Sequence, residues 1–257
     1  MNAVTWVRRH PVWSALCALA VILVVTVAVL WRAAGRSEPV SEGEALAAFR
    51  ASPNDGAFAD GPRLGVYVYA ASGSETGGAG PLAVTRDVPP EARLVVTRRP
   101  DGWESELSYS RQHIEGARYA LRDGAVRVTW RRTKVTFAGF GRDDRRSVEP
   151  PSLFVRSDVK VGDRWKETFR TGDLTVRADT RVVRTEAVDV DGRTVPTYVI
   201  SSSSITQGPH PGTRRETLWW APSLRLPVRW DVDMDIRGTF TFRTNTSVVL
   251  RSVVPAT

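Results

Sequence analysis

The sequence predicts an all-β protein, in which one N-terminal transmembrane helix precedes a curved antiparallel sheet that forms a barrel or half-barrel. Three observations support this class: an apolar run near the N-terminus, period-2 alternation of apolar and polar residues from position 64 onward, and short turn sequences between the alternating segments. Alternating segments joined by short turns form antiparallel meanders. Because one face of these segments is apolar, we expect the sheet to curve over its own core.

The apolar run covers residues 12–31 and reads VWSALCALAVILVVTVAVLW. It holds no charge and no proline, and about 20 helical residues cross a hydrocarbon layer of about 30 Å. Trp13 and Trp31 stand at its two ends, where indole rings favour the headgroup layer. We therefore expect residues 1–11 to form a cytoplasmic tail and the remaining chain to lie outside the cell membrane.

Cleavage as a signal peptide is the alternative for this segment. A signal peptide has an apolar core of about 7–15 residues and a small-residue cleavage site. The core here is longer, and Arg32 and Arg36 flank the candidate site at 33–35. Cys17 follows Leu16, whereas lipid-attachment sequences have a small residue there. We expect an uncleaved anchor in which Cys17 is an apolar membrane residue.

Composition limits which kinds of protein the part of the chain after the anchor can form. Its lack of cysteine excludes a disulfide, so stability must come from the core. The whole chain has 36 basic and 28 acidic residues; the anchor region takes the arginines at 8, 9, 32 and 36, leaving 32 basic residues and a net charge of +4. Nucleic-acid binding requires basic residues clustered on one face, so no nucleic-acid partner is expected.

Residues 32–62 are predicted to link the anchor to a single β-domain at 63–257. Ser41 and Glu44 have the spacing of a capping box before the apolar residues 45–49, which predicts one short helix. The stretch that follows is rich in turn-forming residues.

About ten strands are expected within the β-domain. Asp123-Gly124 and Asp191-Gly192 are hairpin-turn sequences between alternating segments. The charged stretch at 141–151, GRDDRRSVEPP, interrupts the alternation and is predicted to be a loop. The predicted strands lie at residues 64–70, 93–99, 102–110, 118–121, 125–133, 174–182, 195–206, 214–220, 228–237 and 240–253.

Alternation also predicts which face each side chain takes. In segment 125–133, Val126, Val128 and Trp130 should share one face, with Arg131 on the other. In segment 228–237, the odd-numbered charged residues should share a solvated face opposite Trp230.

The second half of the domain carries a family resemblance. Residues 159–165 (VKVGDRW), 216–222 (ETLWWAP) and 226–228 (LPV) resemble a motif set of uncharacterised bacterial extracytoplasmic β-domains. These domains are similar at fold level to LolA-like half-barrels, the lipoprotein localisation factors. The resemblance implies a curved sheet that holds a lipid against its concave face. Ser223 and Arg225 depart from the pattern, which has glycines after the Ala-Pro.

Tryptophans are the candidate ligand-binding residues: Trp130, Trp219, Trp220 and Trp230. Aromatic side chains on a concave sheet can hold an acyl chain, although a packed core is the better explanation of any single tryptophan. Trp219 and Trp220 are adjacent, so in a strand they should face opposite sides, with one on a surface patch or under a loop.

The sequence predicts no enzymatic activity, no cofactor and no metal site. His113 and His210 lack triad or zinc spacing, and an enzyme would need one of them beside a buried carboxylate. Asp231, Asp233 and Asp235 share one strand face about 6.8 Å apart. A straight strand spreads such ligands too far for calcium, so we expect these residues to pair with arginines instead.

Two functions remain open at this point. The first is a membrane-anchored extracytoplasmic binding or scaffold module that holds a lipid, a lipoprotein or another apolar ligand. The second is a ligand-free interaction subunit that docks a membrane or cell-envelope protein. An apolar hollow of several hundred Å³ would favour the first, and a filled interior with an exposed aromatic patch the second.

Overall fold

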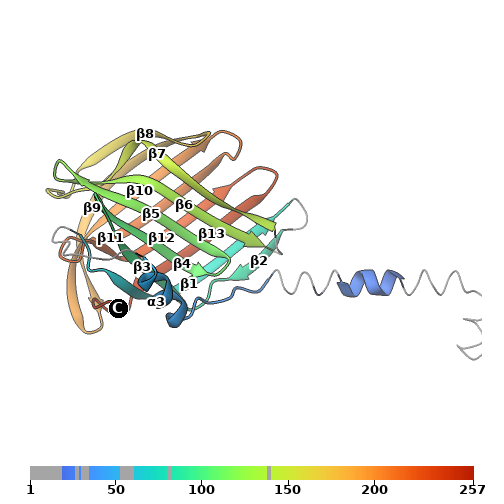
Figure 1. The fold of residues 1–257 in the computed structure, drawn as a ribbon. Coiled ribbons are helices and arrows are strands. Elements are labelled where there is room, and N and C mark those ends of the chain that lie inside the picture. The colour runs from blue at the N-terminus through green and yellow to red at the C-terminus, as the bar shows by residue number, and fades with distance from the viewer. Residues whose placement is uncertain (1–18, 27–28, 30–34, 53–60, 80–82, 138–139) are drawn as a thin grey trace, which may run out of the picture.

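The chain forms a closed antiparallel β-barrel in the computed structural model, which describes residues 19–26, 29, 35–52, 61–79, 83–137 and 140–257 (Figure 1). The all-β antiparallel class is thereby confirmed, and the sheet closes completely where a half-barrel was one alternative. The strands are β1 Gly65–Gly78, β2 Val84–Asp87, β3 Glu91–Arg99, β4 Gly102–Ser110, β5 His113–Arg122, β6 Ala125–Phe137, β7 Phe140–Arg156, β8 Arg164–Thr171, β9 Leu174–Val190, β10 Arg193–Gln207, β11 Gly212–Ala221, β12 Leu226–Ile236 and β13 Thr241–Leu250.

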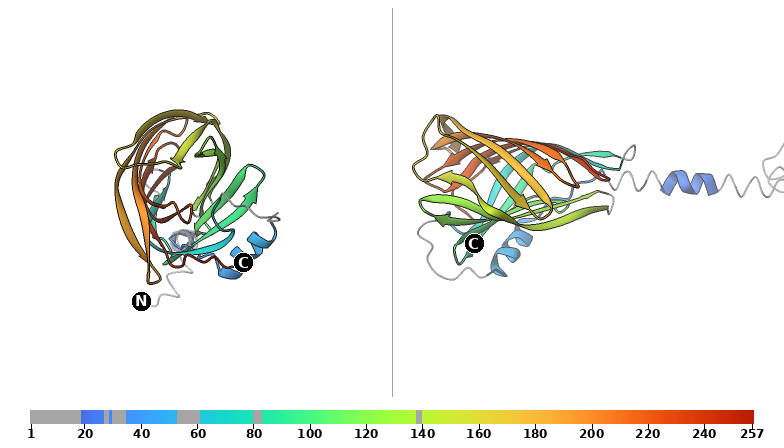
Figure 2. Two further views of the ribbon diagram at one scale, coloured as in Figure 1. Left: turned by 90° about the vertical axis from the view of Figure 1, so that its left-hand side faces the viewer. Right: turned by 90° about the horizontal axis from the view of Figure 1, so that it is seen from above.

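Strand β1 closes the barrel because it pairs along both of its edges. One edge pairs with β13 through ten residue pairs, from Tyr69 with Leu250 to Gly78 with Thr241. The other edge pairs first with β3 and then with β2. Gly73 makes the β13 contact sterically feasible, since a Cβ there would lie 2.0 Å from the Asn245 carbonyl oxygen. The view along the barrel axis shows the resulting ring of strands (Figure 2).

The turns divide the barrel into two ends. The mouth is the end formed by the turns at 172–173, 208–211 and 237–240, and the floor is the end formed by the turns at 123–124, 191–192 and 222–225. Both Asp-Gly sequences form hairpin turns at the floor, and all four of their residues have positive φ (52° and 67°, 54° and 72°). These values match a type I′ turn, which fits the twist of paired strands.

A hydrophobic core fills the barrel toward the floor. Trp103 is 1% exposed and stacks on Tyr119 at 5.1 Å between ring centroids. The Tyr69 hydroxyl donates to the Pro227 carbonyl at 2.7 Å, so a buried polar group is satisfied across the barrel. Leu226 in the floor turn is also buried. This end therefore supplies the core on which a chain without disulfides depends.

Helix α3 (Glu42–Arg50) lies against the outside of the barrel, beside β1 and β3 (Figure 1). The expected capping box is present: Glu44 N–H donates to the Ser41 hydroxyl at 3.2 Å, and Ser41 N–H donates to the Glu44 carboxylate at 2.9 Å. Ala45 and Phe49 are buried together with Val66. This part of the expected linker is thus docked on the barrel.

The predicted membrane span at 12–31 falls mostly outside the described residues. Within it, residues 19–26 are helical, and Leu19, Ile22 and Leu23 are among the large apolar side chains exposed there. No helix among the described residues is both long and apolar enough to span a bilayer.

The loop predicted at 141–151 is wrong, because β7 runs through it. Its charged residues pair with neighbouring strands: Arg132 of β6 contacts Asp143 at 2.8 Å and also Glu106 of β4 at 2.6 Å. Cross-strand ion pairs of this kind stabilise a solvated sheet face, so a charged sequence does not exclude a strand. Strands β2 and β8 also lie outside the predicted segments, which raises about ten expected strands to thirteen.

The barrel wall has one weak seam, between β7 and β8. These strands share a single ladder pair, Glu149 with Arg170, whereas β8 and β9 share eight pairs. The Glu167 carboxylate bridges the seam by accepting the Leu153 backbone N–H at 2.6 Å. A side chain therefore replaces part of the missing backbone ladder.

We expect hydrogen exchange to identify this seam. Backbone amides in β8 that face β7 should exchange faster than those of the fully paired β10 and β11, because exchange follows the stability of local hydrogen bonding. The Leu153 amide should be an exception that Glu167→Ala removes. Equal protection along β8 and β10, measured by mass spectrometry on the full-length protein, would contradict a weak seam.

Candidate functional site: the interior cavity

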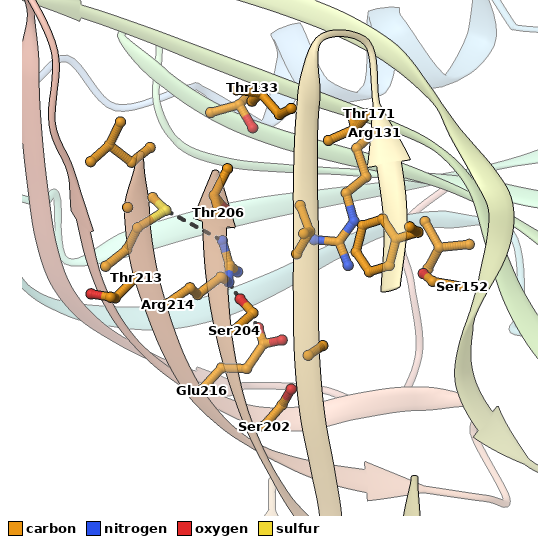
Figure 3. Close-up of a pocket in the computed structure, with 18 of the residues that line it drawn as sticks. Arg131, Thr133, Ser152, Thr171, Ser202, Ser204, Thr206, Thr213, Arg214 and Glu216 are labelled. Carbon is orange, nitrogen blue, oxygen red and sulfur yellow. Dashed lines mark hydrogen bonds and ion pairs between the residues drawn. The ribbon is translucent and has the colours of Figure 1, made fainter. Parts of the chain in front are cut away.

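A cavity of about 210 Å³ lies inside the barrel beside the mouth (Figure 3). Inward-facing residues of strands β6 to β13 form its wall. Its lining is mixed in polarity, because arginine, glutamate, serine and threonine side chains alternate with apolar ones. The apolar lining includes Val135, Phe154, Phe169, Leu174, Val176, Met234, Ile236, Phe240 and Phe242. The polar lining includes Arg131, Thr133, Ser152, Thr171, Ser202, Ser204, Thr206, Arg214 and Glu216.

A chain of ion pairs crosses the barrel interior near this cavity. Arg86 of β2 contacts Glu75 of β1 at 2.8 Å, and both side chains are almost completely buried. Glu75 also contacts Nδ1 of His113 on β5. The other ring nitrogen of His113, Nε2, lies 3.6 Å from the Glu115 carboxylate. His113 is therefore held between two carboxylates.

The chain of ion pairs continues from Glu115 to the cavity wall. Arg214 of β11 contacts Glu115 at 3.0 Å and Glu216 at 3.0 Å. Glu216 also accepts the indole N–H of Trp230 at 3.1 Å. Charges alternate along this path, which is the arrangement that makes buried ionic groups tolerable, since an unpaired buried charge is strongly destabilising. With His113 protonated, the six ionisable groups carry equal numbers of positive and negative charges.

The ionisation of His113 follows from this environment. Burial alone would lower its pKa, but the Glu75 and Glu115 carboxylates outweigh burial and raise the pKa to about 9. Against the effect of burial, His113 and Arg86 hold the pKa of Glu75 below its usual range, and Arg214 and His113 do the same for the pKa of Glu115. His113 also stacks on Tyr109 at 4.7 Å and meets the Phe242 ring at 5.3 Å, which fixes its orientation.

A β-bulge turns Arg131 into the cavity. The ladder between β6 and β7 shifts register between Val128 and Trp130, and a bulge displaces the alternation of side chains by one residue. Val128 and Arg131 consequently both line the cavity, whereas Trp130 faces outward. The prediction that Val128 and Trp130 share a face opposite Arg131 is therefore wrong.

The structure separates the four candidate tryptophans into two groups. Trp220 and Trp230 lie inside, where Trp220 meets Phe154 edge-on at 5.4 Å. Trp130 and Trp219 lie on the outer face, where Arg118 and Arg229 stack over their rings at 4.5 Å and 4.3 Å. The four tryptophans therefore do not form one site, and their role in ligand binding stays a prediction.

The two adjacent tryptophans point to opposite sides of the barrel wall, as predicted, but neither lies on an exposed surface patch. Trp219 and Trp220 face opposite sides of the barrel wall, yet they are only 5% and 4% exposed. Arg229 covers Trp219 and leaves no open aromatic patch there.

The outer face of β12 carries the expected arginine pairs. Asp231 contacts Arg229 at 2.8 Å, and Asp235 contacts Arg237 and Arg243 at 3.4 Å and 3.5 Å. His210 is in the mouth turn after β10 and lines the cavity rim.

Sequence reasoning missed the buried charges. Arg214 and Glu216 are in phase with Leu218 and Trp220 along β11, so they belong to the inward face. This alternation could have revealed the two buried charges, because residues two apart in a strand face the same side whatever their polarity. His113 had a weaker signal, since its partner Glu75 comes from a distant strand and only Glu115, two residues further along β5, is local.

Comparison with known proteins does not assign this chain to a family. No protein family and no curated protein matches the chain. Among solved structures, the hypothetical lipoprotein YmcC from Escherichia coli (K12) is similar with a TM-score of 0.36 and 13% sequence identity, over 74% of this chain and 86% of that chain.

The raised pKa of His113 predicts a loss of stability at alkaline pH. The unfolded chain releases this proton near its usual pKa of about 6.5, but the folded chain releases it only near 9. The stabilisation is therefore complete below pH 6.5 and disappears as the pH rises through 9, with a magnitude of up to about 3 kcal/mol.

Thermal unfolding of the full-length protein between pH 6 and pH 10 measures this effect. His113→Gln should flatten the profile across that window, whereas the matched His210→Gln should keep it. An alkaline loss of stability that persists unchanged in His113→Gln would show that another group causes it.

Proposed function

We propose that the protein is a membrane-anchored extracytoplasmic binding module whose barrel holds a small amphiphilic ligand in the cavity at its mouth. The observation that carries this proposal is the cavity itself, which combines aromatic and aliphatic side chains with a guanidinium and several hydroxyls. Ligand sites are typically apolar hollows with a few polar groups that fix orientation.

The size of the cavity restricts the ligand. Its volume of about 210 Å³ lies below the roughly 300–1,000 Å³ of common ligand pockets. A single short acyl chain suits such a space better than a complete two-chain lipid, unless the β7–β8 seam opens to widen it. We therefore narrow the expected lipid to a small amphiphile.

The start of the barrel domain supports a ligand that comes from the membrane. The Glu38 carboxylate contacts Arg111 at 3.2 Å, and Glu38 N–H donates to the side chain of Gln112 at 3.0 Å. Both partners belong to the β4–β5 turn, which neighbours the end of β6 at the mouth, since Thr136 N–H donates to the Gln112 carbonyl. Glu38 is seven positions after Trp31 in the sequence, so an anchor at 12–31 would lie within about 25 Å of this turn.

His113 has a structural role in this proposal. It meets the condition that an enzyme would require, because it lies beside buried carboxylates. Yet its side chain is fully buried, and it is not part of the cavity lining. We propose that it neutralises Glu75 and Glu115, and that the protein is not an enzyme.

The weak seam between β7 and β8 favours the second candidate function, a subunit that docks a cell-envelope protein. The sparse ladder between β7 and β8 leaves backbone groups free to accept a strand from a partner in the cell envelope. Such a partner would contact the outer wall and would not require the cavity.

A cavity-blocking pair of variants separates the two functions. Ser204 lines the cavity, whereas Ser203, on the same strand, faces outward and is exposed. With full-length protein in lipid nanodiscs, Ser204→Trp should lower photolabelling of the barrel interior by a diazirine-bearing octanoic acid about ten- to a hundred-fold, as overpacking costs about 1–3 kcal/mol. Ser203→Trp should label like the wild type.

Labelling is read by mass spectrometry of peptides from the cavity wall. If the wild type takes up no probe in its interior, the binding function is wrong. If Ser204→Trp labels as strongly as Ser203→Trp, the cavity is not the site.

A further inference from the structure

We propose that the ligand of this cavity carries an acid group and that Arg131 is the residue that binds it. This inference rests on the proposed function and names the chemical class of the ligand: a short anionic amphiphile, with its acid group at Arg131 and its apolar part against the apolar side chains of the cavity.

Arg131 differs from the other arginines of the cavity wall in having an unsatisfied buried nitrogen. Arg214 is committed to two carboxylates, and Arg142 is paired with Asp144. Arg146 has no such pair among the described residues but is exposed to water. The Nε of Arg131, by contrast, is buried and has no hydrogen-bond partner within the described chain.

A buried guanidinium nitrogen without a partner is costly, because it has lost water and gained no acceptor. Figure 3 shows the Arg131 side chain reaching into the cavity from one wall, with Ser204 and Arg214 on the facing wall. An acid group between these walls would supply the missing acceptor. Charge-assisted bonds between a guanidinium and a carboxylate or phosphate are among the strongest in proteins.

The nearby protein carboxylate competes weakly for Arg131. Glu167 already accepts the Leu153 N–H at 2.6 Å across the seam. Burial raises the pKa of Glu167, and it does so by more than the Leu153 N–H and the charges of Arg127 and Arg131 lower it. Within the described chain Glu167 forms this backbone contact and no ion pair with Arg131, so the Arg131 guanidinium is left to an external anion.

Hydroxyl groups complete a polar pocket around this position. Thr133, Ser202 and Ser204 line the same cavity and can donate to an anion. Apolar side chains line the same cavity, among them Met234 from β12 and Phe242 from β13. A short hydrocarbon segment can pack against such side chains while the acid group lies at Arg131.

The test compares two photoreactive probes that differ only in the head group. Diazirine-bearing octanoic acid and the corresponding octanol are each added to full-length protein in nanodiscs, and labelled cavity peptides are quantified by mass spectrometry. The variants are Arg131→Gln, Arg131→Lys and the matched control Arg132→Gln, whose residue faces outward and pairs with Glu106 and Asp143. Circular dichroism checks that each variant is folded.

We expect the wild type to label with the acid about tenfold more than with the alcohol, the factor for one charge-assisted hydrogen bond. Arg131→Gln should bring this ratio close to one, Arg131→Lys should keep part of it, and Arg132→Gln should leave it unchanged. Octanoate and octyl phosphate should both compete with the acid probe, because they share its chemistry.

Two results would overturn the inference. Equal labelling by acid and alcohol, with no effect of Arg131→Gln, would show that the cavity binds apolar chains without reading an acid group, and would leave the proposed function intact. Complete competition by inorganic phosphate alone would show that the site takes a free anion rather than an amphiphile. Absence of labelling by either probe would instead remove the proposed function and the inference with it.

Discussion

Closure of the sheet by the β1–β13 ladder is the constraint on which the rest of this structure depends. These are the first and the last strand of the barrel in sequence order, and ten residue pairs join them. Closure removes the edges that an open sheet would expose, and it creates an interior that water does not reach freely. Every inward-facing side chain must then either pack against apolar neighbours or find a polar partner inside.

The interior meets this requirement differently at its two ends. Toward the floor, aromatic residues such as Trp103 and Tyr119 fill the space. Toward the mouth, ionic groups from β1, β2, β5 and β11 satisfy one another through His113 and Arg214. These pairs leave part of the mouth end unfilled, and the resulting cavity retains one buried guanidinium nitrogen, on Arg131, without a partner. Among the arginines that line the cavity, Arg131 alone carries such a nitrogen within the described residues, and this gives it functional weight.

Much of the fold could be predicted from the sequence, because alternation and turn chemistry act locally. The Asp-Gly hairpins and the capping box of Ser41 and Glu44 form as expected. The errors arise where distant partners decide the outcome. Strand β7 is charged, and its ion pair to Arg132 of β6 cannot be seen from its own residues. The bulge before Trp130 reverses the facing of Arg131, and no local residue signals it. The candidate site itself could not be predicted, since none of the four candidate tryptophans lines the cavity and its charged residues come from strands far apart in the sequence.

Native mass spectrometry of the full-length protein, isolated from its native host without detergent exchange, tests the central claim most directly. The barrel should carry a small ligand at a defined stoichiometry, and organic extraction should release a short anionic amphiphile. Ser204→Trp, isolated in the same way, should lack that mass. A wild-type barrel that is free of ligand under these conditions would contradict the account and would favour a barrel that docks an envelope protein through its outer wall.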